Sequence, residues 1–154
     1  MTINRDLVGR VYESTEPYEV TRGKIREFAE AISDPNPVFR DTAAAKEAGY
    51  PDVIAPPTFP IVMGMQGTGQ IFVDPAVNLE FSGVLHSEQR FRYTRPVQAG
   101  DVVTTTTTIS AIKTIGRHEA MTLESEISTV QGEHLVTATS TLLVRGSAEQ
   151  DAKK

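Results

Sequence analysis

The stretch from Val53 to Val73, VIAPPTFPIVMGMQGTGQIFV, carries no charged side chain over 21 residues. Its prolines, glycines and glutamines distinguish it from a membrane-spanning helix, which needs about 20 predominantly apolar residues. Only residues 58–73 can be helical, with Thr58 as the N-cap and Pro60 in the first turn, where a missing N–H is tolerated. Because apolar residues surround the axis of this helix, the pattern predicts one central buried helix.

Four strands are predicted in the second half of the chain, at residues 84–93, 102–114, 119–131 and 134–145. Their sequences are rich in β-branched residues, and the short turns between them indicate antiparallel neighbours. One face of such a sheet has to be covered, and the uncharged helix can cover it. The sequence therefore predicts an α+β chain with a single hot-dog fold, an antiparallel sheet wrapped around a central helix. This domain spans residues 1–146, and residues 147–154 form a flexible tail.

The first half of the chain contains shorter elements. Extended pieces are expected at residues 7–12 and 18–20. Thr21 caps an amphipathic helix that ends at Ser33, and Asp41 caps a second helix over residues 42–48. The three glycines of the central helix, Gly64, Gly67 and Gly69, indicate that another element packs closely against it, since each costs about 1 kcal/mol in helix propensity.

Composition excludes several classes of function. The chain has no cysteine, which excludes thiolate catalysis, disulfides and cysteine metal sites. Its net charge of −5 argues against nucleic acid or an anionic membrane as a partner. The N-terminal residues lack the apolar run of a secretory signal, so a cytoplasmic location is expected. Neither metal-ligand spacing nor a phosphate-binding glycine loop occurs, and we expect no metal and no cofactor.

The segment between the first two helices carries the chemistry. It reads Asp34-Pro35-Asn36-Pro37-Val38-Phe39, and Asp, Asn and Pro are ordinary loop formers that favour Asx turns. Its position adds meaning, because it precedes a buried helix whose N-terminus could offer backbone donors to an oxygen atom.

This segment resembles the Asp-x-Asn-Pro-(aliphatic)-His signature of the MaoC-like, or R-specific enoyl-hydratase, family. The sequence FRYTRPVQAGD at residues 91–101 also resembles the strand and turn of that family, which end in Pro-x-x-x-Gly-Asp. The likeness extends over about residues 10–146 and is greatest to the short FAS1-like branch, the subunits of mycobacterial-type (3R)-hydroxyacyl-carrier-protein dehydratase. It implies reversible hydration of an enoyl thioester, on carrier protein or coenzyme A, in fatty-acid metabolism.

The chain departs from the signature at Phe39, where the family has a histidine paired with the aspartate. Phenylalanine cannot transfer the proton that an imidazole handles near neutral pH. The resemblance therefore implies a substrate-binding subunit that works with a histidine-bearing sister chain. Asp34 and Asn36 would then organise the loop, while Phe39 and the backbone around Pro57 and Thr58 would bind the acyl thioester.

Other interpretations remain open. A self-sufficient hydratase could use Asp34 with His86 as a replacement acid/base, although a histidine that begins a strand more often lies at a subunit surface. The chain could also be an acyl-thioester-binding module without chemistry, or, less favoured, a thioesterase. In each case an unpaired edge strand of the sheet predicts a homodimer or a heterodimer with the sister chain.

Overall fold

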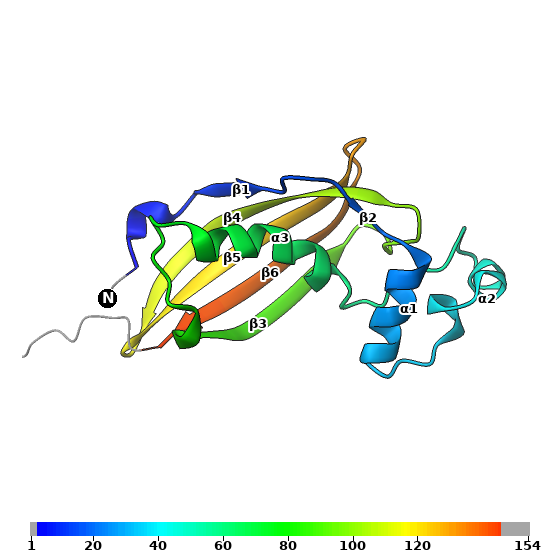
Figure 1. Ribbon diagram of the computed structural model, residues 1–154, viewed down its shortest axis with the longest axis horizontal. Helices are drawn as coiled ribbons and strands as arrows, with labels where there is room; N and C mark the ends of the chain where they lie inside the picture. Colours follow the sequence, from blue (N-terminus) through cyan, green and yellow to red (C-terminus); the bar gives the residue numbers. More distant parts are fainter. Residues whose placement is uncertain (1–2, 146–154) are drawn as a thin grey trace, which may run out of the picture.

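The computed structural model describes residues 3–145, and the predicted tail at 147–154 lies outside them. Figure 1 shows one antiparallel sheet with the helix α3 lying along it. In chain order the elements are η1 (Arg5–Leu7), β1 (Val11–Glu13), β2 (Tyr18–Glu19), α1 (Arg22–Ala31), η2 (Pro37–Phe39), α2 (Thr42–Glu47), α3 (Pro60–Val73), η3 (Phe81–Gly83), β3 (Val84–Tyr93), β4 (Val102–Ile115), β5 (His118–Thr129) and β6 (His134–Val144). The predicted α+β class and hot-dog architecture are confirmed.

The sheet follows the order β1-β4-β5-β6-β3, and β2 also pairs with β4. Every pairing is antiparallel. Tight turns with positive φ at Gly116 and Gly132 join β4 to β5 and β5 to β6, as the antiparallel prediction requires. The four long strands begin and end within two residues of the predicted positions. The extended piece predicted at residues 7–12 is wrong in its first part, because residues 5–7 form a 3₁₀ turn and the strand begins at Val11.

The central helix differs from the prediction at its start. It begins at Pro60, and its N-cap is Phe59, with no side-chain cap hydrogen bond. Thr58 is therefore not the cap that the sequence predicted. The ring of Phe59 is fully buried, so packing in the core, rather than a capping hydroxyl, fixes where the helix begins.

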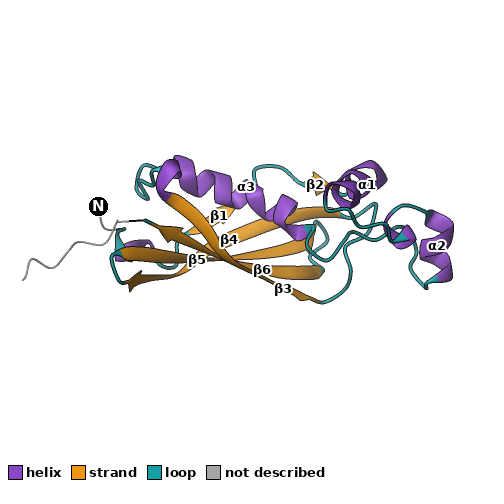
Figure 2. Cartoon of the chain, turned by 90° about the horizontal axis from the view of Figure 1, so that it is seen from below, coloured by secondary structure: helices purple, strands orange, loops and turns teal. Residues whose placement is uncertain are grey.

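The helix is buried on one side only. Met63 and Ile71 are fully buried against the sheet, whereas Met65 is 57% exposed and Val73 is 79% exposed. Figure 2 shows α3 as a separate layer on one side of the sheet. The prediction that this helix is enclosed all round is therefore wrong for a single chain, since the sheet covers only the face that contacts β4, β5 and β6.

A glycine sets the distance between helix and sheet. A Cβ atom added to Gly67 would lie 2.7 Å from Thr107 Cβ, which is closer than real side chains approach. Thr107 is fully buried, and its hydroxyl shares a 2.8 Å hydrogen bond with the Ser125 hydroxyl beneath the helix. The predicted close packing against the glycines is thus confirmed at Gly67, while Gly69 faces open space.

The interior has two apolar clusters, one under each half of α3. The first includes Ile25, Phe39 and Phe59 and lies towards α1 and α2. The second is closed by Ile3 and Leu7 of the N-terminal segment. Within residues 3–145 no helix is long and apolar enough to cross a membrane.

Candidate functional site

The loop that follows α1 is braced by its own polar side chains. Helix α1 ends before Ser33, which adopts a left-handed φ of 57°. The Asp34 carboxylate then accepts a 3.0 Å hydrogen bond from the Asn36 N–H, and the Asn36 side-chain oxygen accepts one of 3.2 Å from the Val38 N–H. These two Asx turns place both predicted polar residues in a role of local organisation.

Arg40 holds the same loop from its far side. Its guanidinium donates a 2.8 Å hydrogen bond to the Asp34 carbonyl oxygen and lies 3.6 Å from the Glu30 carboxylate. Between these contacts the η2 turn carries Phe39 inward, where the ring is only 5% exposed. The backbone of this loop therefore presents an apolar ring, rather than a titratable group, to the interior.

A pocket of about 440 Å³ opens beside this loop. Its size is typical of small-molecule sites, about 300–1,000 Å³. Most of its wall is apolar, and it is lined by Asn36, Val38, Phe39, Ala48, Tyr50, Ile54, Ala55, Pro57, Tyr93 and Pro96. Three of the predicted substrate-binding residues, Asn36, Phe39 and Pro57, thus share one pocket. Asp34 and Thr58 are not part of its lining.

Tyr93 fixes the pocket wall opposite the loop. Its hydroxyl donates a 2.7 Å hydrogen bond to the Pro57 carbonyl oxygen. Burial raises the pKa of Tyr93 above its ordinary value, which keeps the hydroxyl protonated. Because Pro57 has no N–H and its carbonyl is already bonded, the donor that remains at this point is the Thr58 N–H, which has no acceptor within residues 3–145.

The second family-like motif is a structural clamp. Arg95 forms paired hydrogen bonds of 3.0 and 2.8 Å to the Asp101 carboxylate and of 2.8 and 3.0 Å to the Glu133 carboxylate. The pKa of Arg95 is raised by these partners, and that of Glu133 is lowered by Arg95. The loop so fixed accepts a 2.7 Å hydrogen bond at Val97 from the Ala55 N–H, which holds one wall of the pocket.

His86 lies far from this pocket within its own chain. It is exposed near the start of β3, and its Nε2 atom lies 3.0 Å from the Glu88 carbonyl oxygen. Tyr93 follows seven residues later at the other end of the strand, a distance of roughly 23 Å along an extended chain. Figure 1 shows β3 running from η3 towards the end that carries α1 and α2. One chain therefore does not bring Asp34 and His86 together.

The remaining described surface offers no comparable apolar site. A polar hollow of about 600 Å³ lies along β3, β5 and β6, lined by Ser87, Glu88, Gln89, Arg90, Thr122, Thr139 and Thr141. Over residues 3–145 no three His, Asp or Glu side chains are grouped as metal ligands would be. The pocket beside Phe39 is thus the candidate site.

Sequence relatives of this chain span nearly their whole length. A UPF0336 protein of Thermobifida fusca is 65% identical over 148 residues, which cover 96% of this chain and 97% of the relative. A UPF0336 protein of Streptomyces avermitilis is 48% identical over 149 residues, covering 97% and 99% of the two chains.

Solved structures agree with the fold. A chain of the C-terminally truncated HadBC complex, a (3R)-hydroxyacyl-ACP dehydratase from Mycobacterium tuberculosis, superposes with a TM-score of 0.81 and 26% identity, covering 90% of this chain and 97% of that chain. A MaoC-like dehydratase gives a TM-score of 0.83 at 30% identity, and the match covers 90% of this chain and 42% of that longer one. The family described as FAS1-like, dehydratase domain region, matches residues 6–138. The chain belongs to this family of MaoC-like hot-dog dehydratases.

Proposed function

We propose that this protein is a substrate-binding subunit of a (3R)-hydroxyacyl-thioester dehydratase, which also runs as an enoyl-thioester hydratase. The pocket beside Phe39 would hold the acyl chain. The observation that carries the proposal is the Phe39 ring in the pocket wall, at the point in the loop where the family signature ends in histidine. An apolar wall of this kind favours an acyl group and supplies no proton.

The thioester carbonyl would be bound at the start of α3. The Thr58 N–H has no acceptor within residues 3–145, and it stands beside Pro57, which lines the pocket. A free backbone donor at the beginning of a helix favours an oxygen that gains negative charge. The substrate would be carried by acyl-carrier protein or coenzyme A, in cytoplasmic fatty-acid metabolism, and the chemistry would need neither a metal nor a cofactor.

Turnover would need a histidine-bearing sister chain in a heterodimer. Two observations support this assembly. The Asp34 carboxylate is occupied in an Asx turn, and His86 lies at the far end of β3 from the pocket. The HadBC chain that superposes on this one comes from a two-protein complex.

A second candidate function is acyl-thioester binding without any catalysis. The same pocket favours it, since the described residues of the pocket wall include no histidine, aspartate or glutamate. The self-sufficient hydratase that pairs Asp34 with His86 is disfavoured for an isolated chain by their separation.

The central experiment is the Phe39→His substitution, assayed with crotonyl-coenzyme A. General acid–base help is typically worth about 10²–10⁴-fold, so an imidazole at this position should give measurable hydration where the parent gives little or none. Adding Asp34→Asn should abolish the gain. If Phe39→His binds the thioester and hydrates it no faster than the parent, residue 39 does not occupy the histidine position of the family.

The Phe39→Ala substitution separates binding from folding. The upper limit for removing a buried phenylalanine is about 3–5 kcal/mol of stability, and a ring at a pocket wall should cost less. We expect affinity for an enoyl thioester, measured by calorimetry, to fall more than the free energy of unfolding. Equal losses would make Phe39 a packing residue only.

A further inference from the structure

Strand β3 is an open edge. Among the described strands it pairs with β6 alone, so its other side presents a row of unpaired main-chain groups, which proteins usually cover. We propose that a second copy of this chain pairs antiparallel with β3 about a two-fold axis at Gln89, and that each chain thereby places its His86 beside the acyl pocket of the other. The part of this proposal that concerns ligand binding rests on the proposed function.

Geometry restricts where the axis can lie. Glu88 and Arg90 stand opposite Thr141 and Thr139 of β6, whereas Gln89 stands opposite Ser140, so alternate residues of β3 face opposite sides of the sheet. Directly opposed residues of two antiparallel strands share a face. A symmetric pair must therefore place its axis through a residue, not between two residues.

Charge selects Gln89 among the possible axes. An axis at Glu88 would oppose two carboxylates, one at Arg90 would oppose two guanidinium groups, and one at Phe91 would oppose Arg90 to the partner's Arg92. An axis at Gln89 opposes Glu88 to the partner's Arg90 twice. Opposed unlike charges favour strand pairing and like charges disfavour it. Within residues 3–145 neither Glu88 nor Arg90 forms a salt bridge.

Gln89 itself lacks a partner that this arrangement would supply. Its Oε1 atom is buried and accepts no hydrogen bond within residues 3–145, while its Nε2 atom makes only a 3.5 Å contact with the Arg90 carbonyl oxygen. A carboxamide is both donor and acceptor. Two copies that face each other at a two-fold axis can therefore bond reciprocally, which is the self-complementarity that an isologous interface requires.

This register moves His86 to the pocket of the other chain. A β-bulge lies between His86 and Glu88, so His86 and Ser87 together oppose one residue, the partner's Phe91. Phe91 is two residues from Tyr93, which lines the pocket. Diagonal neighbours across paired strands lie about 7–8 Å apart, compared with roughly 23 Å between His86 and Tyr93 of one chain.

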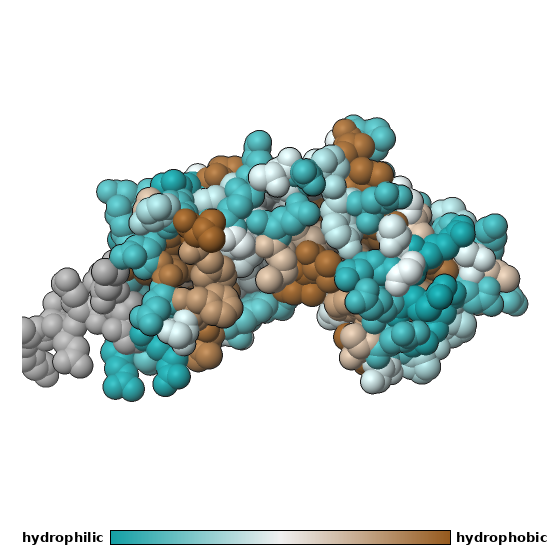
Figure 3. All heavy atoms as spheres, viewed as in Figure 1, coloured by the Kyte–Doolittle hydropathy of each residue, from teal (hydrophilic) through white to brown (hydrophobic). Residues whose placement is uncertain are grey.

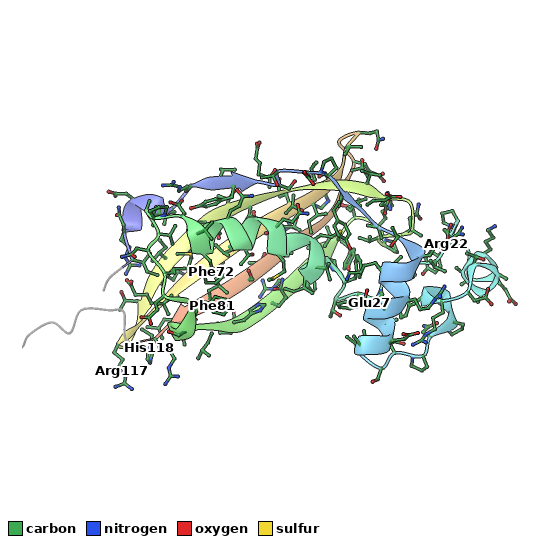
Figure 4. The ribbon with its side chains drawn as sticks, in the orientation of Figure 1. Arg22, Glu27, Phe72, Phe81, Arg117 and His118 are labelled. Atoms are coloured by element: carbon green, nitrogen blue, oxygen red, sulfur yellow. The ribbon has the colours of Figure 1, made fainter. Side chains whose placement is uncertain are left out.

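The same symmetry covers exposed apolar side chains. Phe81 is 75% exposed and Leu85 is 48% exposed, just before and at the beginning of β3. Figure 4 shows Phe81 beside Phe72 of α3, with ring centroids 5.1 Å apart, and Figure 3 shows apolar surface gathered there. Antiparallel pairing sets this end of β3 against the pocket end of the partner, where an apolar surface awaits it.

Cross-linking tests the register, and the absence of cysteine makes the result simple to interpret. In Gln89→Cys the two thiols meet at the axis, so mild oxidation should give a disulfide dimer. In the control Leu85→Cys the two copies lie roughly 27 Å apart and should stay uncrosslinked. Efficient cross-linking of Glu88→Cys or Arg90→Cys instead of Gln89→Cys, or of Leu85→Cys equally, would overturn the proposed register.

Charge variants test the pairing in solution. Glu88→Arg alone and Arg90→Glu alone should each weaken self-association at least tenfold in sedimentation. An equimolar mixture of the two variants should associate as tightly as the parent, since every opposed pair is again of unlike charge. Association of the mixture no tighter than that of either variant alone would contradict the model of Glu88 facing the partner's Arg90.

The same mixture decides whether His86 acts across the interface, with trans-2-decenoyl-coenzyme A as the probe. Ala48 lines the pocket and is exposed, so Ala48→Trp should block one pocket of the pair. With Ala48→Trp in one chain and His86→Ala in the other, the open pocket faces an intact His86 and should bind as the parent does. With both substitutions in the same chain, affinity should fall roughly 3–10-fold, the worth of one hydrogen bond.

Each other outcome is informative. The reverse order of affinities would place His86 in its own chain's site, and equal affinities would remove it from the site, so either overturns the inference. Absence of binding by the parent dimer would instead refute the proposed function and with it the ligand role of His86. The cross-linking result would then still confirm or overturn the pairing at Gln89.

Discussion

The two edges of the sheet are built in opposite ways. At one edge β4 is covered by β1 and β2, which belong to the N-terminal part of the same chain. At the other edge the ten residues of β3 have no neighbour on their outer side among the described strands. The covered edge is short-stranded and tied down, whereas the open edge is long and carries exposed charged residues.

Side chains from α3 and the following turn secure the covered edge. The Tyr12 hydroxyl donates a 2.7 Å hydrogen bond to the Asp74 carboxylate, which also lies 2.8 Å from the Arg10 guanidinium. Gln70 donates a 2.7 Å hydrogen bond to the Glu13 carbonyl oxygen. These contacts belong to one chain, so the covered edge should determine the stability of the fold, while the open edge should determine assembly.

The largest expected effect comes from the contact between α3 and the covered side of the sheet. Gly67→Ala would press a methyl group into Thr107, and such overpacking costs typically about 1–3 kcal/mol. Gly69→Ala is the matched control on the same helix, because it meets no atom within 4 Å. Removing that glycine should stabilise the helix by up to about 1 kcal/mol.

Urea unfolding of the two variants measures this difference. Midpoints that move in opposite directions would assign the stability of α3 to its contact with β4. If Gly67→Ala is as stable as Gly69→Ala, the helix is free to shift on the sheet, and the close approach at Thr107 does not hold the covered edge.

The sequence predicts the frame of the molecule better than its details. The threonine-rich strands could be read because alternation and turn residues are local signals. The start of α3 could not, since Thr58 is a good cap by type, yet burial of Phe59 decides the boundary. The exposed side of α3 was missed for a related reason. An apolar helix surface predicts burial, but not whether the covering surface belongs to the same chain.

The candidate site was predictable only where its residues are close in sequence. Asn36 and Phe39 follow from one motif, and both line the pocket. Tyr50 and Tyr93 were missed, because distant segments bring them to the same wall. For Tyr93 a signal existed, since it shares a strand face with Phe91 and follows the alternation of β3. Tyr50 stands in an irregular connection that gives no such pattern.

A middle-sized effect is expected from the tie at β1. Tyr12→Phe removes only the hydroxyl, and the lost hydrogen bond should reduce the free energy of unfolding by about 0.5–1.5 kcal/mol. The reduction should depend on pH. Burial and the hydrogen bond to Asp74 raise the pKa of Tyr12 from its ordinary value of 10.0 to about 12, so this contribution is complete below pH 10 and is lost as the pH rises towards 12.

Acid should act on the same tie from the other side. The Tyr12 hydroxyl lowers the pKa of Asp74 below its ordinary value of 3.8, so that contribution is present above this value and is lost as the pH falls below it. Denaturant titrations of parent and Tyr12→Phe should therefore differ by a constant amount between about pH 5 and 9. A difference that stays unchanged up to pH 12 would separate Tyr12 from the stability of this edge.

The smallest effect on folding is expected at the open edge. Leu85 is 48% exposed, and Leu85→Ser should change the unfolding free energy of the dilute chain by no more than about 0.5 kcal/mol. The same substitution removes apolar surface that the proposed dimer covers, so its dissociation constant in sedimentation should rise several-fold. Parent and variant should then melt alike at nanomolar concentration and diverge at high concentration, because only association stabilises the parent further. Identical melting at every concentration would mean that β3 does not associate through this end. A loss of stability already present in the dilute chain would mean that Leu85 supports the fold, and the contrast between the two edges would then be wrong.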